Sequence, residues 1–335
     1  MNQKDRKRFW DMLSNMCDAS PKQIESLRTT IKMPHTLCRF RSISESTLTQ
    51  LQENKLFFST ADRYDDPFDT YFYINYPKLQ ILLDQFNNML NDPTSRDAFV
   101  TAVSAMGIPA KEILEASMAS SAFPNMQQLK ERICQVRDTV QKNLYSICFC
   151  EDPLNETLWL KYGDNHQGFV LVYDFYDNAT RLCGFEEKCK NCGIALNPPN
   201  IYPVYYSSKR YDATRYTVSL LLSNALNITQ LPALQTLYQS MQQSMMWEIE
   251  RISLIKKYRH HYDGEWRMIL PTPYSSRPSI KLKPKKIIIG LRTPEYKKLL
   301  IAAAAKVAGI SQIYTMRINE KDRLALVPFI TEKSP

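Results

Sequence analysis

Asp263, Glu265 and Arg267 alternate with other residues in the segment YDGEWRMIL, which covers residues 262–270. Residues two apart on a β-strand share one face, so the pattern predicts a strand with two carboxylates and a guanidinium on the same side. Burying neighbouring carboxylates without partners costs several kcal/mol. The segment is therefore typical of either an ion-pair ladder on an edge strand or a functional site.

Two earlier segments carry polar side chains on predicted strands. HTLCRFRSI (35–43) places Arg39 and Arg41 two residues apart, so both are expected on one face. LFFSTA (56–61) predicts a second strand, on which the Ser59 and Thr60 hydroxyls point to opposite faces. Arg39 and Arg41 thus repeat, on another strand, the clustering of charge seen at residues 263–267.

An acidic segment, DRYDDPFDTYF, follows the second strand and places Asp65, Asp66 and Asp69 around Pro67. Hard metal cations prefer such oxygen ligands, so a metal site is one interpretation. Aspartate side chains also accept hydrogen bonds from nearby backbone amides in turns. The turn is the simpler interpretation.

A further candidate, WLKYGDNHQG (159–168), collects Trp159, Tyr162 and His166. Two aromatic rings and a histidine are suited to stacking a base or a nicotinamide ring. A histidine that bonds a turn carbonyl explains His166 equally well. The chain has no HExxH, GxSxG or glycine-rich phosphate loop, which argues against zinc proteases, esterases and Rossmann or P-loop enzymes.

The composition is that of an ordinary globular protein: 44% of the 335 residues are hydrophobic and 11% are aromatic. No segment approaches the roughly 20 apolar residues of a membrane span, and the N-terminal residues lack the apolar core of a signal peptide. A cytoplasmic location is therefore expected. Cys183, Cys189 and Cys192 form the one metal candidate among the cysteines; without a clear fourth ligand, unligated thiols are the simpler interpretation.

The net charge of +9 is concentrated in one part of the chain. Residues 251–298 contain 13 Lys and Arg against 3 Asp and Glu. Such a basic region indicates either an anionic partner, such as a nucleotide or nucleic acid, or a solvated basic face.

The order of the predicted elements favours an α+β fold with a mixed, mainly antiparallel central sheet. Residues 1–33 are predicted to form an N-terminal helical segment. Residues 34–335 are predicted to form a single α+β domain. Helical insertions are expected at about 77–143 and 213–260, where apolar residues recur at helical spacing.

Several segments in order resemble a widespread bacterial domain-of-unknown-function family. These segments are LCRFRSISESTLTQLQENKLFFSTADRYDDPFD, ICFCEDPLNETLWLKYGDNHQGFVLVYDF, YPVYYS, EWRMIL and KKIIIGLRTPE. The family pattern is a Tyr-Lys-Tyr-Arg-Ser strand, a Phe-Asn-Asp-Pro-Phe-Asp/Glu turn, a Trp-x-x-Tyr-Ala/Gly-x-x-His-x-Gly segment and a late Glu-x-Glu-Trp/Tyr-Arg strand. The resemblance covers nearly all predicted strands between about 36 and 327, and it implies a role in phage defence or stress response.

The same pattern more distantly resembles the ADP-ribosyltransferases, and this resemblance implies NAD as the substrate. By position, Arg39 or Arg41 would hold the NAD phosphates or ribose, and Ser59, with Thr60, would orient the glutamate. Glu265 would bond the ribose and stabilise the positive charge that forms as nicotinamide leaves. Asp263 would align the acceptor, although the family has glutamate there, which puts acceptor activation in doubt. Cys38-Arg39-Phe40 in place of Tyr-Lys-Tyr leaves the choice between the two arginines open.

The leading hypothesis is an NAD-using ADP-ribosyltransferase-like enzyme, such as a defence or toxin effector, with a polyanionic or protein target. One alternative is a non-catalytic module that binds a nucleotide or nucleic acid. Another is a metal-dependent nuclease that uses Asp66, Asp69 and Glu265.

Overall fold

The computed structural model describes residues 1–16, 20–71, 73–105, 110–111, 115, 126–175, 201–220, 245, 247–270 and 277–330. A nine-stranded sheet has its strands in the order β13-β12-β11-β5-β1-β4-β9-β6, and β3 pairs with β4. Its pairings are antiparallel except for β11 with β12. The α+β prediction with a mixed, mainly antiparallel sheet is confirmed. The strands are β1 (Thr36–Arg41), β3 (Ser59–Thr60), β4 (Tyr145–Cys150), β5 (Phe169–Asp174), β6 (Ile201–Pro203), β9 (Glu265–Leu270), β11 (Lys286–Ile289), β12 (Ile313–Ile318) and β13 (Leu324–Pro328).

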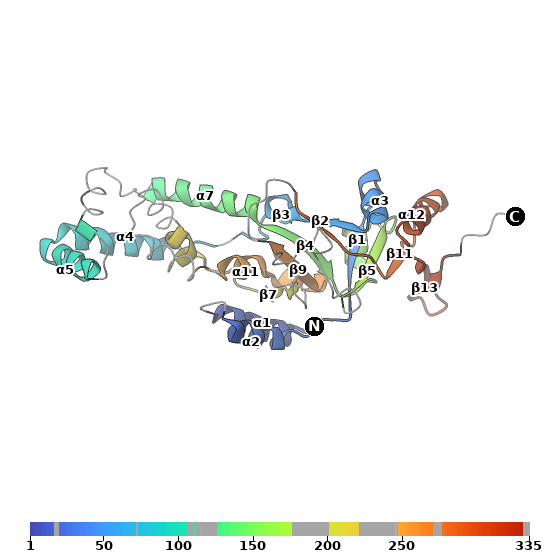
Figure 1. Ribbon diagram of the computed structural model, residues 1–335, viewed down its shortest axis with the longest axis horizontal. Helices are drawn as coiled ribbons and strands as arrows, with labels where there is room; N and C mark the ends of the chain where they lie inside the picture. The colour runs from blue at the N-terminus through green and yellow to red at the C-terminus, as the bar shows by residue number, and fades with distance from the viewer. Residues whose placement is uncertain are drawn as a thin grey trace.

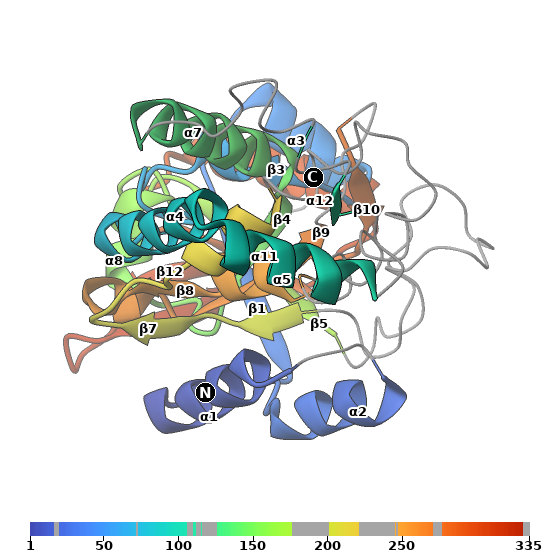
Figure 2. The same cartoon turned by 90° about the vertical axis from the view of Figure 1, so that its left-hand side faces the viewer.

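Two short sheets and a set of helices surround this sheet. Figure 1 shows α4 and α5 at one end of the long axis and α12 with β13 at the other, while α1 and α2 lie along one side, as Figure 2 also shows. The short sheets pair β2 (Lys55–Phe57) with β10 (Ser279–Lys281) and β7 (Tyr205–Ser207) with β8 (Ile255–Lys257). The helices are α1 (Gln3–Ser14), α2 (Pro21–Thr30), α3 (Glu45–Gln52), α4 (Tyr76–Asn91), α5 (Pro93–Ser104), α7 (Met126–Asn143), α8 (Glu156–Lys161), α11 (Glu248–Ser253) and α12 (Glu295–Val307), with 3-10 turns η1 (Ala61–Arg63) and η2 (Tyr258–Asp263).

The two predicted insertions fare differently. The range 77–143 contains α4, α5 and α7, in agreement with the helical periodicity. In the range 213–260, residues 221–244 and 246 lie outside the described residues. Residues 214–220 and α11 are helical, but residues 255–257 form β8, which pairs in parallel with β7. The helical prediction is therefore wrong at the end of this range. Pairing with Tyr205–Ser207 fixes these residues in an extended conformation.

The segment that begins at Asp263 is not an edge strand. β9 starts at Glu265, lies between β4 and β6, and is buried along its whole length. Asp263 is the last residue of η2, and Gly264 follows with a left-handed φ of 53°. The prediction of an edge-strand ladder is therefore wrong, and a turn rather than strand alternation brings Asp263 beside Glu265.

The sheet is weakly joined between β1 and β4. These strands are in register at one pair, Cys38 with Cys150, whereas β1 with β5 and β4 with β9 each share six pairs. Beyond this pair, residues 39–41 of β1 and Ser146, Cys148 and Phe149 of β4 line a common cavity. The separation of the two strands therefore opens the central sheet and exposes polar residues that would otherwise lie inside it.

The N-terminal helix α1 is anchored to the same part of the sheet. Arg6 is buried, and its Nη1 donates to the carbonyl oxygens of Val204 at 2.7 Å and Glu265 at 2.8 Å. Its Nη2 donates to Glu151 Oε1 at 2.6 Å. The helix thus holds the start of β9 from outside the cavity.

Glu250 in α11 makes the stability of the protein depend on pH. Its buried Oε2 has no hydrogen-bond partner within the described part of the chain, and burial raises its pKa from 4.5 to about 7. As the pH rises above 4.5, the unfolded chain loses this proton before the native state does, so stability falls until the pH passes about 7. We expect Glu250→Gln to gain on the order of 1–3 kcal/mol over the wild type near pH 8 and little at acid pH.

Chemical denaturation over this pH range measures the effect. Glu320→Gln, at an exposed position, is the control. A difference between the Glu250 variant and the wild type that does not change with pH would contradict the assignment.

Candidate functional site

The opening between β1 and β4 contains a cavity of about 380 Å³. This volume lies within the range of small-molecule sites. Residues from β1, β4, β9, the 59–69 segment, α8 and the β8–η2 segment line it. Its polar lining residues include Arg39, Arg41, Ser59, Arg63, Tyr64, Asp65, Asp66, Asp69, Ser146, Cys148, Lys161, Tyr162, Lys256, Asp263, Glu265 and Arg267.

Arg267 is the centre of a buried ion cluster. Its side chain is 1% exposed, and its two terminal nitrogens donate to the Asp69 carboxylate at 2.8 and 2.6 Å. Its Nε donates to Glu265 Oε1 at 2.6 Å, and Nη1 also donates to the Ser253 carbonyl at 2.7 Å. Burial opposes its charge, but Asp69 and Glu265 outweigh burial and raise the pKa of Arg267. The guanidinium is therefore charged and held by three separate segments.

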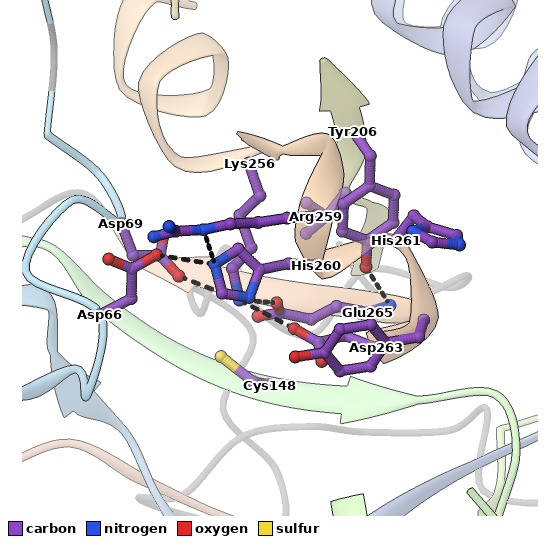
Figure 3. Close-up of polar contacts among 12 residues, drawn as sticks. Asp66, Asp69, Cys148, Tyr206, Lys256, Arg259, His260, His261, Asp263 and Glu265 are labelled. Carbon is purple, nitrogen blue, oxygen red and sulfur yellow. Dashed lines mark hydrogen bonds and ion pairs between the residues drawn. The ribbon is translucent and has the colours of Figure 1, made fainter. Parts of the chain in front are cut away.

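Lys256 completes the cluster from β8. Its Nζ lies 2.9 Å from Glu265 Oε2, 3.1 Å from Asp263 Oδ2 and 3.3 Å from Asp69 Oδ2. Figure 3 shows Lys256 with these three carboxylates around it. Burial opposes ionisation of Glu265, yet Arg267 and Lys256 hold its pKa far below the ordinary value. Glu265 is thus a permanently ionised carboxylate with both oxygens bonded to cations.

Asp263 has a different environment from Glu265. Its Oδ2 bonds Lys256, while its buried Oδ1 has no hydrogen-bond partner among the residues described. Burial raises the pKa of Asp263, and the neighbouring Glu265 charge adds to the effect. A buried oxygen without a partner is costly, so it marks a position where a ligand donor would bind. Asp263 is the carboxylate of the cluster best placed to accept a proton.

The β1 side of the cavity carries positive charge without counter-ions. Neither Arg39 nor Arg41 has a carboxylate within ion-pair distance in the described ranges, and the buried Arg39 Nη1 has no hydrogen-bond partner there. Burial lowers the pKa of both guanidinium groups, for Arg41 to about 9, and the charges of Arg39 and Arg277 add to the lowering at Arg41. Arg277 donates to the Phe58 carbonyl at 2.8 Å and to Ser59 Oγ at 3.3 Å. Such an arrangement favours a bound anion, because an anion would replace the lost hydration.

Cys148 of β4 lies between these two groups of charges. Burial raises the pKa of its thiol to about 11, and the Glu265 charge contributes to the rise. The thiol is therefore neutral at physiological pH, and it lies 3.6 Å from Ser146 Oγ. A neutral thiol at this place separates the arginines from the carboxylates without adding charge.

The structure brings most of the predicted site residues together. Arg39, Arg41, Ser59, Tyr162, Asp263, Glu265 and Arg267 all line the cavity. Thr60, Trp159 and His166 are not among its lining residues. Trp159 is fully buried, its indole N–H donates to the Pro153 carbonyl at 2.9 Å, and its ring stacks on His166 at 5.5 Å. The stacking role predicted for this pair is thus satisfied within the protein, because each ring stacks on the other.

Three functional groups were missed in the sequence. Asp69 was interpreted as a turn residue or a metal ligand, whereas its carboxylate pairs with Arg267. The turn bond is made by Asp66, whose Oδ1 accepts from the Phe68 amide at 2.9 Å. Lys256 lies at the end of a stretch that the periodicity assigned to a helix, and Arg277 lies in a loop outside the quoted motifs. Lys256 and Arg267, which line the cavity, and Arg277, which donates to Ser59 at its wall, all belong to the basic region 251–298. This region therefore supplies charge to the site.

The metal hypotheses gain no support from the described residues. In those ranges, no group of three His, Cys, Asp or Glu side chains could hold a metal ion. Asp69 and Glu265 bond to Arg267 and Lys256 instead. Cys183, Cys189 and Cys192 lie outside the described residues.

No described helix is long and apolar enough to span a membrane.

No family model, curated protein or solved structure matches this chain. The resemblance in the sequence to a bacterial domain-of-unknown-function family therefore stays a hypothesis. The case for function consequently depends on the cavity itself.

Removing the central guanidinium should destabilise the fold. Arg267→Met leaves Asp69 and Glu265 buried with half of their partners, so we expect a loss of about 3–5 kcal/mol in the free energy of unfolding. Urea denaturation measures this loss. Arg317→Met, at an exposed arginine of β12, should change stability by less than about 0.5 kcal/mol. Equal effects of the two substitutions would show that the cluster is not a structural centre.

Arg39 and Arg41, which have no counter-ion in the described ranges, should instead act on ligand binding. We expect Arg39→Met and Arg41→Met to leave the free protein as stable as the wild type or more stable, because each removes a half-buried charge that has no counter-ion among the described residues. Saturating pyrophosphate should raise the melting temperature of the wild type by about 2 °C or more and should raise it less in both variants. The Arg317→Met control should respond to pyrophosphate like the wild type. If pyrophosphate also raises the melting temperature of the Arg39 and Arg41 variants by the wild-type amount, the anion binds elsewhere.

Proposed function

We propose that the protein cleaves NAD and transfers its ADP-ribose group to an acceptor. One observation carries the proposal: a single cavity joins Arg39 and Arg41 on the β1 side, which have no counter-ion among the described residues, to Asp263 and Glu265 on the β9 side. NAD has a matching distribution of groups, with a diphosphate in the middle and a positively charged nicotinamide on a ribose at one end. The resemblance to ADP-ribosyltransferases supports the same assignment.

The arginines would bind the diphosphate. Arginine presents a planar set of donors that matches two phosphate oxygens, and the charge-assisted bonds are strong in a partly buried site. Arg39 Nη1, which is buried without a partner in the described part of the chain, would gain an acceptor. Ser59, which accepts from Arg277, would fix the position of the third guanidinium at the same wall.

The carboxylates would then take different roles in the reaction. The bond between ribose C1′ and the nicotinamide nitrogen breaks, and its electron pair neutralises the pyridinium. Glu265, ionised and fixed by Arg267 and Lys256, would accept a hydrogen bond from a ribose hydroxyl and stabilise the positive charge on the sugar. Asp263 Oδ1 would take the proton from the acceptor atom that attacks C1′.

A second candidate is a non-catalytic nucleotide sensor. The observation that favours it is that both oxygens of Glu265 and both of Asp69 already bond to cations. A cluster satisfied in this way is also what a purely structural role requires. The sensor would use the same arginines to bind nucleotide but would leave NAD intact.

Nicotinamide release from NAD tests the enzyme. We expect Glu265→Gln to lower the release rate by about 10²–10³-fold, because the carboxylate charge is lost from the transition state. Asp263→Asn should lower transfer to an acceptor by about 10²–10⁴-fold. Since only ionised Asp263 accepts a proton and its pKa is raised, wild-type transfer should rise with pH through a midpoint above the ordinary aspartate value.

The exposed Glu320→Gln variant is the matched control for these rates. If NAD raises the melting temperature of the wild type but no nicotinamide appears, the sensor is correct and the enzyme is not. If NAD neither binds nor reacts, both candidates fail for this nucleotide.

A further inference from the structure

Four exposed aromatic rings lie on segments that also line the cavity, and one of them, Tyr162, lines the cavity itself. Phe68, Tyr162, Tyr258 and Tyr262 are 48%, 38%, 52% and 38% exposed, respectively. Phe68 belongs to the acidic turn, Tyr162 follows α8, and the other two belong to η2, which ends at Asp263. Each of these segments also contributes residues to the cavity lining. We call these four residues the aromatic rim.

Direct contacts connect the segments that carry the rim. His260 Nε2 lies 3.1 Å from Asp66 Oδ2 in the acidic turn and accepts from Arg259 Nε at 3.2 Å. Asn155 at the start of α8 donates to the Tyr262 carbonyl at 2.6 Å. Figure 3 shows Asp66, Arg259, His260 and His261 around the cluster that contains Asp263. The turn, η2 and α8 thus form one continuous surface.

Within η2 the rings hold each other in fixed orientations. His261 stacks on Tyr258 with centroids 4.7 Å apart and planes inclined by 8°, and it meets Tyr262 edge-on at 6.2 Å. The Tyr258 ring is therefore supported on one side by imidazole and exposed elsewhere. A ring fixed in this way loses little conformational entropy when a second planar group stacks on it.

Positive charges alternate with the rings of the rim. The Arg210 guanidinium lies 4.5 Å from the centre of the Phe68 ring, and Lys257 Nζ lies 6.0 Å from the same centre. Lys161 Nζ lies 4.9 Å from the centre of the Tyr162 ring. Within the described ranges, none of these three cations has a carboxylate at ion-pair distance. Their charge is available to a partner.

We propose that the aromatic rim binds single-stranded nucleic acid. Phosphates would lie on Arg210, Lys257 and Lys161, and unpaired bases would stack on Phe68 and Tyr258, which is how single strands are bound without sequence preference. The bases of a duplex stack on each other inside the helix, so they are not available to stack on the aromatic rings of the rim. An acidic protein would meet the cations but would leave the rings unused.

The η2 segment, which carries two rings of the rim, ends at Asp263, so a strand on the rim would lead to the cavity there. The buried Oδ1 of Asp263 has no hydrogen-bond partner among the described residues. Binding of the strand needs no NAD and goes beyond the proposed function. Only its role as the acceptor of ADP-ribose rests on that function. A hydroxyl or a base nitrogen of the nucleotide at the cavity entrance would then be the atom whose proton Asp263 takes.

Fluorescence anisotropy with labelled oligonucleotides tests the inference on the whole protein. We expect a mixed-sequence single strand of about 20 nucleotides to bind more tightly than the duplex of the same sequence. Phe68→Ala and Tyr258→Ala should each weaken binding by roughly 5–150-fold, since each ring stacks one base. Lys257→Gln should reduce the salt slope by about 0.7, the value for one contacted phosphate on a single strand.

Tyr296→Ala is the matched control, because Tyr296 is 63% exposed on α12, which connects β11 to β12 at the other end of the sheet order from β9. Thermal unfolding of each variant confirms that it is folded. Equal binding of duplex and single strand, or no effect of the rim substitutions in folded protein, would overturn the proposal. Polyglutamate that competes as well as the single strand would also overturn it and would indicate an acidic protein partner.

Nicotinamide release is measured on the same variants. Phe68→Ala and Tyr258→Ala, which should weaken strand binding, should leave NAD cleavage in the absence of a strand within a few-fold of wild type. Wild-type protein that binds the single strand but releases no nicotinamide from NAD would overturn the proposed function but not strand binding. Wild-type protein that cleaves NAD but does not bind the single strand would overturn only this inference.

Discussion

The burial of the Arg267 guanidinium is the constraint on which the rest of the site depends. A charge removed from water must be matched by acceptors, and here they come from the acidic turn, from β9 and from the end of α11. The Asp69 side chain therefore points into the core. As a result, the acidic turn that contains Asp69 lies against the cavity. The centre of the Tyr64 ring lies 5.3 Å from the same guanidinium, so Tyr64 packs against Arg267 as well. One buried charge thus fixes three segments that are distant in the sequence.

The two sides of the cavity differ because one is electrostatically complete and the other is not. On the β9 side, three carboxylates surround Lys256 and Arg267, so the charges nearly balance and the groups are held in place. On the β1 side, Arg39 and Arg41 repel each other and lack counter-ions within the described residues. The complete side gives the cavity its shape. The incomplete side gives it a preference for anions, because only a ligand supplies the missing charge.

Sequence reasoning succeeded where one local rule decided the structure. Alternation placed Glu265 and Arg267 on one face, and the mixture of helical and strand periods gave the α+β class. Sequence reasoning failed where a turn, or a partner distant in the sequence, decided the local structure. Gly264 takes Asp263 off the strand, and β8 forms because β7 is available to pair with it. Trp159 failed for another reason, since a large aromatic ring fits a core and a ligand site equally well before its neighbours are known.

The N-terminal helices, which the sequence separates from the α+β domain, take part in the same arrangement. Hydrogen bonds hold both polar groups of the Glu265 backbone. Its amide donates to the Tyr206 hydroxyl at 2.7 Å, and its carbonyl accepts from Arg6 at 2.8 Å. Neither bond uses the side chain, so the carboxylate can point into the cavity while the backbone is fixed from outside. Arg6 also bonds Glu151, one residue beyond the Cys38–Cys150 junction of β1 and β4. Helix α1 therefore fixes β9, on the carboxylate side of the cavity, relative to the Cys38–Cys150 junction, where β1 and β4 begin to separate. The distance between the arginine side and the carboxylate side thus depends on a helix that contributes no residue to the cavity lining.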